Sequence, residues 1–274
     1  MTAKGIDPAP AARIRFVLSH TSHPGNIGAA ARAIRTMGFG RLVLVAPQAF
    51  PHADATALAA SAGDVLSAAR VHADLPQAIE GARLVLGATA RRRGITLEEL
   101  GPGAMAARVL AATAAGEDVA LVFGNERSGL SNEELARCHA AIAIPTDPEC
   151  PSLNLAQAVQ VVAWELRRAQ LEGSVADATP GRREVPAAAD ALEGFFGHLA
   201  QTLEDIEFHK GRSPRTILQR LRRLFLRARP DERELRILRG IFADASRMAR
   251  LAREGRGDQG PRGGRPAWDD RAAR

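Results

Sequence analysis

The segment from His23 to Pro47 places polar groups at the start of a predicted helix and one arginine within that helix. An apolar stripe recurs at the spacing of a helix that packs on a sheet: Ile27, Ala30, Ala31 and Ile34. Arg32 lies off the stripe, and Gly28, one turn earlier on the same side, would let a ligand backbone approach its guanidinium. Asn26 can cap the helix or bind a substrate hydroxyl. On spacing alone, an ordinary amphipathic helix with a solvated arginine is the simpler interpretation.

A second polar segment, GNERSGL at residues 124–130, follows a predicted buried strand and leads into a helix. That helix opens with Ser131 and Glu134 at the spacing of a capping box. A strand, a loop and a helix in this order are typical of a ligand-binding loop. Gly124 and Gly129 frame the loop, but no Lys-Ser/Thr pair follows, so the sequence does not support a P-loop nucleotidase.

Two further segments carry polar groups after predicted strands. Ser152 and Asn154 stand at the start of a long predicted helix, where hydroxyl, amide and free backbone donors occur together. A plain helix cap is the more common interpretation of this pair. At residues 91–93, three arginines directly follow another strand, where at least one could enter the same crevice; three solvated arginines are the alternative.

Neither metal chemistry nor hydrolase chemistry finds support in the motifs. His20 and His23 lie near Arg32, but no third ligand follows at a regular spacing, so we expect no metal site. The G-x-S-x-G turn of a serine hydrolase is also absent from the sequence.

Composition indicates a soluble protein with a sizeable core. The chain has 274 residues, of which 46% are hydrophobic. It contains no apolar run of the roughly 20 residues that a membrane span needs, and its polar start lacks the apolar core of a signal peptide. Two cysteines without C-x-x-C spacing predict free thiols in a reducing compartment. We therefore expect a cytoplasmic protein without a membrane partner.

The net charge of +6 is concentrated in the C-terminal part of the chain. Residues 1–170 hold 16 basic and 15 acidic side chains, whereas the remainder holds 21 and 16. Residues 210–229 carry eight basic groups and no acid, several of them on one predicted helix face. This pattern favours contact with nucleic-acid phosphates, with a solvated basic face as the alternative. The absence of tyrosine disfavours a base-stacking platform.

The order of predicted elements indicates an α/β fold with a mostly parallel sheet flanked by helices. Six short apolar runs are predicted strands: residues 13–19, 41–46, 69–73, 83–88, 119–124 and 140–145. Predicted helices lie between or after them: near residues 27–37, 54–67, 75–81, 97–115, 131–138 and 153–171. Ligands of such sheets bind beyond the carboxyl ends of the strands, so three polar loops should converge there: ATARRR, GNERSG and PTDPECPSLN.

We expect five segments along the chain. A flexible N-terminus (residues 1–12) precedes the α/β domain (residues 13–171). A polar linker (residues 172–186) leads to a small all-helical module (residues 187–252) with three amphipathic helices. The Gly/Arg/Asp-rich tail (residues 253–274) buries little apolar surface and is expected to be disordered.

Three segments taken together resemble a known enzyme class. NIGAAAR, GNERSGL and IPTDPECPSLNLAQAVQV match, in order and separation, the motifs of SPOUT-class methyltransferases of the TrmH-like branch. Further stretches resemble the TrmJ family of bacterial tRNA 2'-O-methyltransferases, which act on nucleotide 32 of the anticodon loop: SHTSHPGNIGAAARAIRTMGF, TARRR, RSGLSNEELARCH and LRRLFLRARPDERELRILRGI. The likeness extends over about residues 13–250.

This resemblance implies a trefoil knot at the carboxyl end of the sheet, S-adenosyl-L-methionine as cofactor, tRNA as substrate and an obligate homodimer. It implies that Arg32 activates the ribose 2'-hydroxyl, with Asn26 beside it and Arg93 and Ser152 as further functional positions. It also implies a set of cofactor-binding residues: Ala88, Thr89, Ala90, Gly124, Glu126, Ile144, Pro151, Ser152, Leu153 and Asn154.

The chain departs from the family pattern at two places, and one family assignment conflicts with chemistry. Cys150-Pro151 stands where an aromatic residue and a serine are usual, and His20 stands where an acid is common. The family account makes the arginine a general base, yet a guanidinium stays protonated because its pKa lies above about 12. We expect Arg32 to stabilise the developing alkoxide while a phosphate or water takes the proton.

Three other functions fit parts of the sequence. The same chemistry could act on ribosomal RNA. A non-catalytic RNA-binding dimer of the same fold is a second alternative, against which the intact Asn26, Arg32, Glu126 and Asn154 argue. A helix-turn-helix regulator, suggested by the basic C-terminal helices, would need sequence-dependent binding to duplex DNA.

Overall fold

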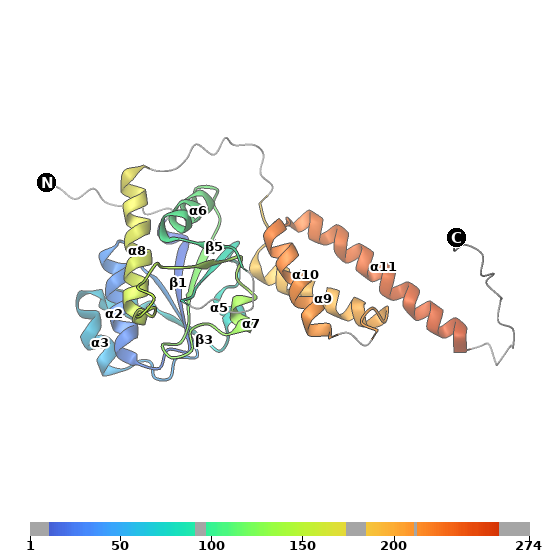
Figure 1. Ribbon diagram of the computed structural model, residues 1–274, viewed down its shortest axis with the longest axis horizontal. Coiled ribbons are helices and arrows are strands. Elements are labelled where there is room, and N and C mark those ends of the chain that lie inside the picture. The colour runs from blue at the N-terminus through green and yellow to red at the C-terminus, as the bar shows by residue number, and fades with distance from the viewer. Residues whose placement is uncertain (1–10, 91–96, 174–184, 211–212, 258–274) are drawn as a thin grey trace.

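The computed structural model describes residues 11–90, 97–173, 185–210 and 213–257. An α/β part lies on the left of Figure 1 and a group of three helices on its right. Residues 91–93, with the expected functional Arg93, lie outside the described residues, as do most of the expected flexible N-terminus, linker and tail.

A seven-stranded parallel sheet forms the centre of the α/β part, in the order β3-β2-β1-β6-β4-β7-β5. Six strands confirm the six predicted apolar runs: β1 (Ile14–Ser19), β2 (Arg41–Val45), β3 (Arg70–His72), β4 (Leu84–Ala88), β6 (Val119–Phe123) and β7 (Ala140–Ile142). The seventh, β5 (Glu99–Leu100), was not predicted. The parallel sheet flanked by helices confirms the expected fold class.

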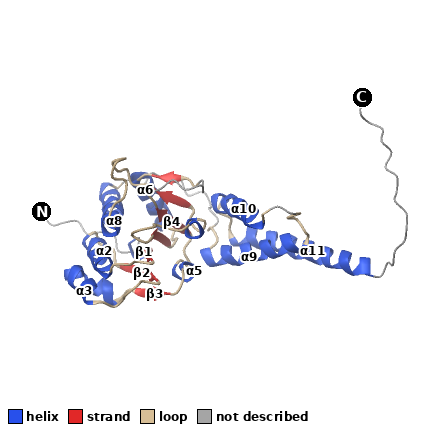
Figure 2. Ribbon diagram, turned by 60° about the horizontal axis from the view of Figure 1, so that its bottom comes forward, coloured by secondary structure: helices blue, strands red, loops and turns tan. Residues whose placement is uncertain are grey.

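Alternate residues of the central strands pack on opposite faces of the sheet. In β1, Phe16 and Leu18 join one apolar cluster, while Val17 joins the other. The first cluster is covered by α2 (Pro24–Thr36), α3 (Ala53–Ala59), α4 (Gly63–Ser67), α6 (Pro102–Ala114) and α8 (Leu155–Glu172). The second is covered by α5 (Leu75–Ala78) and α7 (Asn132–Leu135). Figure 2 shows α2, α3 and α8 on one side of the strands and α5 on the other.

Two predicted helices are wrong in their extent. The helix expected over residues 54–67 is interrupted after α3 by a short 3-10 turn, where Ala60 adopts a φ of 48°. The helix expected over residues 97–115 begins only at Pro102, because Glu99 and Leu100 pair with β7 as β5. The edge of β7 offers backbone hydrogen bonds to Glu99 and Leu100, and these bonds outweigh the preference of the two residues for a helix.

The C-terminal helices pack around their own apolar cluster. They are α9 (Ala189–Asp205), α10 (Pro214–Ala228) and α11 (Glu232–Gly257), and they confirm the three predicted amphipathic helices. Phe195 lies at the centre of the cluster, with ring contacts to Phe196, Phe225 and Phe242. Helix α11 continues to Gly257, beyond the end at residue 252 that the sequence suggested.

Two expectations from composition concern membrane spans and thiols. No helix in the described part of the chain is long and apolar enough to cross a membrane. Cys138 and Cys150 are both free, as predicted, and burial raises the pKa of the Cys138 thiol to about 12. Cys138 therefore behaves as a small apolar core residue.

Candidate cofactor-binding and catalytic site

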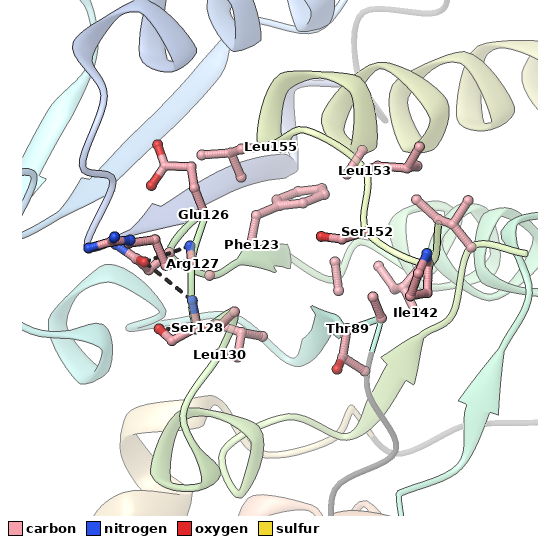
Figure 3. Close-up of a pocket in the computed structure, with 18 of the residues that line it drawn as sticks. Thr89, Phe123, Glu126, Arg127, Ser128, Leu130, Ile142, Ser152, Leu153 and Leu155 are labelled. Carbon is pink, nitrogen blue, oxygen red and sulfur yellow. Dashed lines mark hydrogen bonds between the residues drawn. The ribbon is translucent and has the colours of Figure 1, made fainter. Parts of the chain in front are cut away.

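Three loops that follow β4, β6 and β7 line one pocket at the carboxyl edge of the sheet (Figure 3). The loop after β4 contributes Ala88 to Ala90, and the loop after β6 contributes Phe123 and residues 124–130. The loop after β7 contributes residues between Ile142 and the start of α8. The sequence predicted this convergence from the position of each loop after a parallel strand.

The loop after β6 is closed on itself by backbone contacts. Gly129 donates from its N–H to the carbonyl of Asn125 at 2.7 Å and has a φ of 65°. A Cβ on Gly124 would lie 2.2 Å from the carbonyl carbon of Gly129 and from the amide nitrogen of Leu130. The Asn125 side chain accepts from the N–H groups of Arg127 and Ser128, as the dashed lines in Figure 3 indicate. Glycine is therefore required at position 124 by close backbone approach.

Glu126 joins this loop to the start of α2. Its carboxylate accepts from the Ser22 N–H at 2.9 Å, the Ser22 hydroxyl at 2.8 Å, the His23 N–H at 3.2 Å and the Asn26 side-chain amide at 2.9 Å. Burial raises the pKa of Glu126, but the hydrogen bonds from Asn26 and Ser22 outweigh it, so the pKa falls to about 2. The carboxylate is ionised at neutral pH and is held by neutral donors. It cannot serve as a base near pH 7.

Asn26 and Asn154 connect two of the three segments that carry the family resemblance, NIGAAAR and IPTDPECPSLNLAQAVQV. The Asn154 amide donates to the side-chain oxygen of Asn26 at 3.0 Å, and the Asn154 oxygen caps α8 by accepting from the N–H groups of Ala156 and Gln157. Asn154 does not line the pocket. Of the two roles that the sequence left open for Asn26, the cap of α2 is wrong, because the helix begins earlier, at Pro24, and Asn26 bonds to Glu126 instead.

Of the ten residues expected to bind cofactor, all except Asn154 line the pocket: Ala88, Thr89, Ala90, Gly124, Glu126, Ile144, Pro151, Ser152 and Leu153. The pocket also contains residues that the sequence analysis did not expect to bind cofactor: Phe123, Asn125, Arg127, Ser128, Gly129, Leu130, Ile142, Thr146, Leu155 and Ala158. Arg127 and Ser128 stand within the GNERSGL motif, so the loop itself carried the signal that could have identified them.

The structure places Arg32 and Gly28 differently from the sequence interpretation. Gly28 is buried, and a Cβ there would lie 2.0 Å from the carbonyl oxygen of Ala55. It therefore makes room for α3, and the expected approach of a ligand backbone at Gly28 is wrong. Arg32 is exposed on α2, lies outside the pocket wall and pairs with no acid among the described residues.

Comparison with known proteins identifies the family. Residues 13–164 match the model of the SpoU rRNA Methylase family, and residues 190–255 match that of the tRNA methyltransferase TrmJ C-terminal domain. A curated relative from Pseudomonas aeruginosa (strain UCBPP-PA14), named tRNA (cytidine/uridine/adenosine-2'-O-)-methyltransferase TrmJ, is 47% identical over 87% of this chain and 95% of its own length. The chain belongs to the TrmJ family of SpoU-type methylases.

Other TrmJ relatives and solved structures agree. A relative from Citrobacter koseri, named tRNA (cytidine/uridine-2'-O-)-methyltransferase TrmJ, is 47% identical over 84% of this chain and 95% of its own length. The crystal structure of TrmJ from Z. mobilis ZM4 matches with a TM-score of 0.73 at 32% identity, over 84% of this chain and 97% of that one. A probable methylase family protein from Haemophilus influenzae Rd KW20 matches with a TM-score of 0.58 at 36% identity, over 88% and 99%.

Proposed function

We propose that this chain is a tRNA 2'-O-methyltransferase that transfers a methyl group from S-adenosyl-L-methionine to the ribose of cytidine or uridine at nucleotide 32. The observation that carries the proposal is the joint match of both parts of the chain to TrmJ proteins, over nearly their whole length. Two of the three family motifs, GNERSGL and IPTDPECPSLNLAQAVQV, line one pocket together with the loop after β4, which is consistent with a shared ligand site. The proposal includes the trefoil knot, the cytoplasmic location and the domain limits expected from the sequence, with the end of the helical module moved to residue 257.

The pocket suits the cofactor by the chemistry of its wall. Leu130, Ile142 and Leu155 offer apolar surface to a flat base, and Thr89 and Ser152 add hydroxyl groups. The ionised Glu126 gives the wall a negative charge that favours a cationic ligand. When bound, S-adenosyl-L-methionine supplies a methyl group from a sulfonium.

Arg32 is assigned the role of stabilising the developing 2'-alkoxide. A guanidinium is a cation without a free acceptor site, so it lowers the energy of a negative oxygen and does not remove the proton. A phosphate of the substrate or a water takes the proton. Asn26, fixed between Glu126 and Asn154, stands at the start of the same helix and holds its orientation.

A homodimer forms part of the proposal because Arg32 lies outside the pocket wall of its own chain. The two helices that pack beside α2 carry exposed apolar side chains: Leu58 on α3, and Trp164 and Leu171 on α8. A second copy that covers these side chains would lie next to Arg32, and the guanidinium and a pocket would then face one another across the interface.

Helix α10 is the proposed tRNA contact of the C-terminal module. Arg220, Arg223 and Arg227 recur at helical spacing, and none of them pairs with an acid among the described residues. Unpaired guanidiniums on one face neutralise successive phosphates and make binding strongly dependent on salt.

Nucleoside mass spectrometry tests the function. Unmodified tRNA is incubated with the protein and S-adenosyl-L-methionine, and any added methyl is located by fragment mapping. We expect 2'-O-methylcytidine or 2'-O-methyluridine at nucleotide 32. Methylation of ribosomal RNA alone would mean that ribosomal RNA, and not tRNA, is the substrate. Cofactor binding without methyl transfer to either RNA would favour a non-catalytic RNA-binding dimer.

Arg32→Ala should reduce turnover by at least about 100-fold, on the scale of removing one stabiliser of a developing oxyanion, while the affinity for S-adenosyl-L-methionine is retained. Arg35→Ala is the matched control, since Arg35 lies on the same helix, is exposed and pairs with Asp64 at 2.9 Å. Loss of cofactor affinity in Arg32→Ala would contradict the role assigned to Arg32.

A further inference from the structure

Helix α7 lies between the pocket and the C-terminal helices. It follows the pocket loop directly, and Ser131 and Glu134 form the predicted capping box at its start. Glu134 also accepts a hydrogen bond from the hydroxyl of Ser19, the last residue of β1. The N-terminal end of α7 is therefore anchored to the sheet.

The C-terminal end of α7 is held by α9 and α10. The Arg222 guanidinium on α10 donates from Nε to the carbonyl of Ala136, which caps α7, at 3.0 Å. Arg222 also forms an ion pair with Glu193 of α9 and lies 4.4 Å from the ring centre of Phe196. Arg137, the next residue after the cap, forms an ion pair with the same Glu193. One carboxylate therefore joins two guanidiniums from opposite sides of the contact.

Arg137, Glu193 and Arg222 form a partly buried cluster, so removal of the Glu193 charge should destabilise it. The Arg222 side chain is 16% exposed, and Arg137 and Glu193 are 26% and 28% exposed. Burial, and then the nearby Arg137, lower the pKa of Arg222 to about 10, which leaves it cationic at neutral pH. Without Glu193, two partly buried like charges would face each other. By contrast, Arg215 and Glu133, which also link α10 to α7, are largely exposed and contribute little.

The position of α7 determines one wall of the pocket through Leu130. Leu130 lines the pocket and is buried in an apolar cluster with Leu135 of α7, Cys138 and Ala189 of α9. A Cβ on Gly87 of β4 would lie 2.8 Å from the Cys138 sulfur and 2.9 Å from Leu130 Cδ1, so the cluster has no spare room on its sheet side. A shift of α7 is therefore passed to Leu130.

We propose that Glu193 and Arg222 of the helical module are positioning residues for the cofactor pocket. They hold the end of α7, and with it Leu130 and the loop after β6, in the geometry that binds the cofactor. The helical module thus has a second task besides contact with RNA: it completes the support of the pocket wall. This inference rests on the proposed function.

Cofactor affinity of a full-length variant tests the proposal. Glu193→Gln keeps the shape of the side chain and removes its charge, and Glu204→Gln, an exposed acid on the same helix, is the matched control. Calorimetric titration with S-adenosyl-L-methionine should give a Kd about tenfold weaker for Glu193→Gln and unchanged for Glu204→Gln. In steady-state assays the KM for cofactor should rise, while kcat at saturating cofactor and the Kd for tRNA stay near their wild-type values.

Two further variants keep the test decisive if Glu193→Gln does not fold. Glu193→Asp should recover part of the affinity, and Arg222→Lys, which loses the forked contact with Ala136 and Glu193, should weaken cofactor binding like Glu193→Gln. Wild-type cofactor affinity in the folded variants would overturn the proposal, as would an equal loss in Glu204→Gln. Failure of the wild type to bind S-adenosyl-L-methionine would instead overturn the proposed function.

Discussion

The loop after β6 is supported on two flanks, and the two flanks use different chemistry. Toward α2, Glu126 collects four neutral donors from residues 22–26. Toward α7, α9 and α10, Glu193 collects two guanidiniums, Arg137 and Arg222. Each flank depends on one carboxylate. Glu126 accepts hydrogen bonds from backbone, hydroxyl and amide donors, whereas Glu193 neutralises the charge of two guanidiniums.

This difference determines what each flank tolerates. Loss of the acid on the α2 flank leaves donors without acceptors, a cost of about 1–3 kcal/mol per buried group that salt does not relieve. Loss of the acid on the α7 flank leaves two cations close together, a repulsion that salt reduces. Both flanks join residues that are far apart in the chain, but the residues of the α2 flank lie within or beside the sequence motifs, whereas Glu193 and Arg222 of the α7 flank lie outside them.

Gly124→Ala should have the largest effect, because it acts on the loop that both flanks support. The added methyl would lie 2.2 Å from backbone atoms of Gly129 and Leu130, which cannot move aside as a flexible side chain would. We expect destabilisation of about 1–3 kcal/mol or more and a loss of cofactor affinity of at least about 100-fold. Thermal unfolding and calorimetric titration measure the two effects.

Gly40→Ala is the control for this substitution, since a Cβ at Gly40 meets no atom within 4 Å. It should leave both stability and cofactor affinity close to the wild type. Normal cofactor binding by Gly124→Ala would mean that the loop can rearrange without either flank, and the comparison between flanks would then have no bearing on the pocket.

The sequence predicted the sheet and the meeting of the loops well, because both follow from local patterns. Apolar runs with few polar residues mark buried parallel strands, and the ends of such strands share one edge. The errors lie where tertiary contacts outweigh local preference. Glu99 and Leu100 become a strand because β7 offers an open edge, and Ala60 breaks a helix whose apolar spacing continues through it.

The sequence predicted part of the pocket wall but not the connections between its residues. The motif residues were recognised by resemblance, and most of the expected cofactor residues line the pocket. The bonds of Asn26 to Glu126 and Asn154 could not be read from spacing, because they join residues at least 100 positions apart. Gly28 was misread for the same reason: the atom that requires a glycine there belongs to Ala55 on a different helix.

Acid should destabilise the sheet beside β7 before it affects the α2 flank. His139 lies directly before β7, and its Nδ1 accepts from the Val85 N–H at 3.0 Å. Burial, followed by the nearby Arg229, lowers the pKa of His139 to about 3. The unfolded chain binds this proton near pH 6.5 and the folded chain does not, so folding loses up to about 1.4 kcal/mol per pH unit as the pH falls below about 6. Glu126 contributes its full stabilisation above its unfolded pKa of about 4.5 and loses it as the pH falls from there toward about 2.

Urea unfolding at pH 7, 6, 5 and 4 measures this loss. The difference between the wild type and His139→Asn isolates the histidine from the acidic groups that titrate in the same range. We expect the variant to be less stable at pH 7 and to depend less on pH between 6 and 4. Parallel pH profiles for the two proteins would show that His139 is protonated as readily in the folded chain as in the unfolded chain, and the acid sensitivity expected from it would be wrong.

Glu126→Gln should have the smallest of these effects and should act on one flank alone. The amide retains one acceptor oxygen and replaces the other with a donor, so either the Ser22 pair or the His23 and Asn26 pair loses its acceptor. We expect a loss of about 1–3 kcal/mol in stability. Hydrogen exchange locates this loss: the amides of Ser22 and His23 should exchange faster, while the amide of Glu134, which donates to Ser131 at 3.1 Å, should not change.

Glu133→Gln, at an exposed ion pair on α7, is the control and should alter the protection of neither set of amides by more than about 0.5 kcal/mol. Faster exchange at Glu134 in Glu126→Gln would mean that the two flanks form one cooperative unit, and their different chemistry would then not separate their responses.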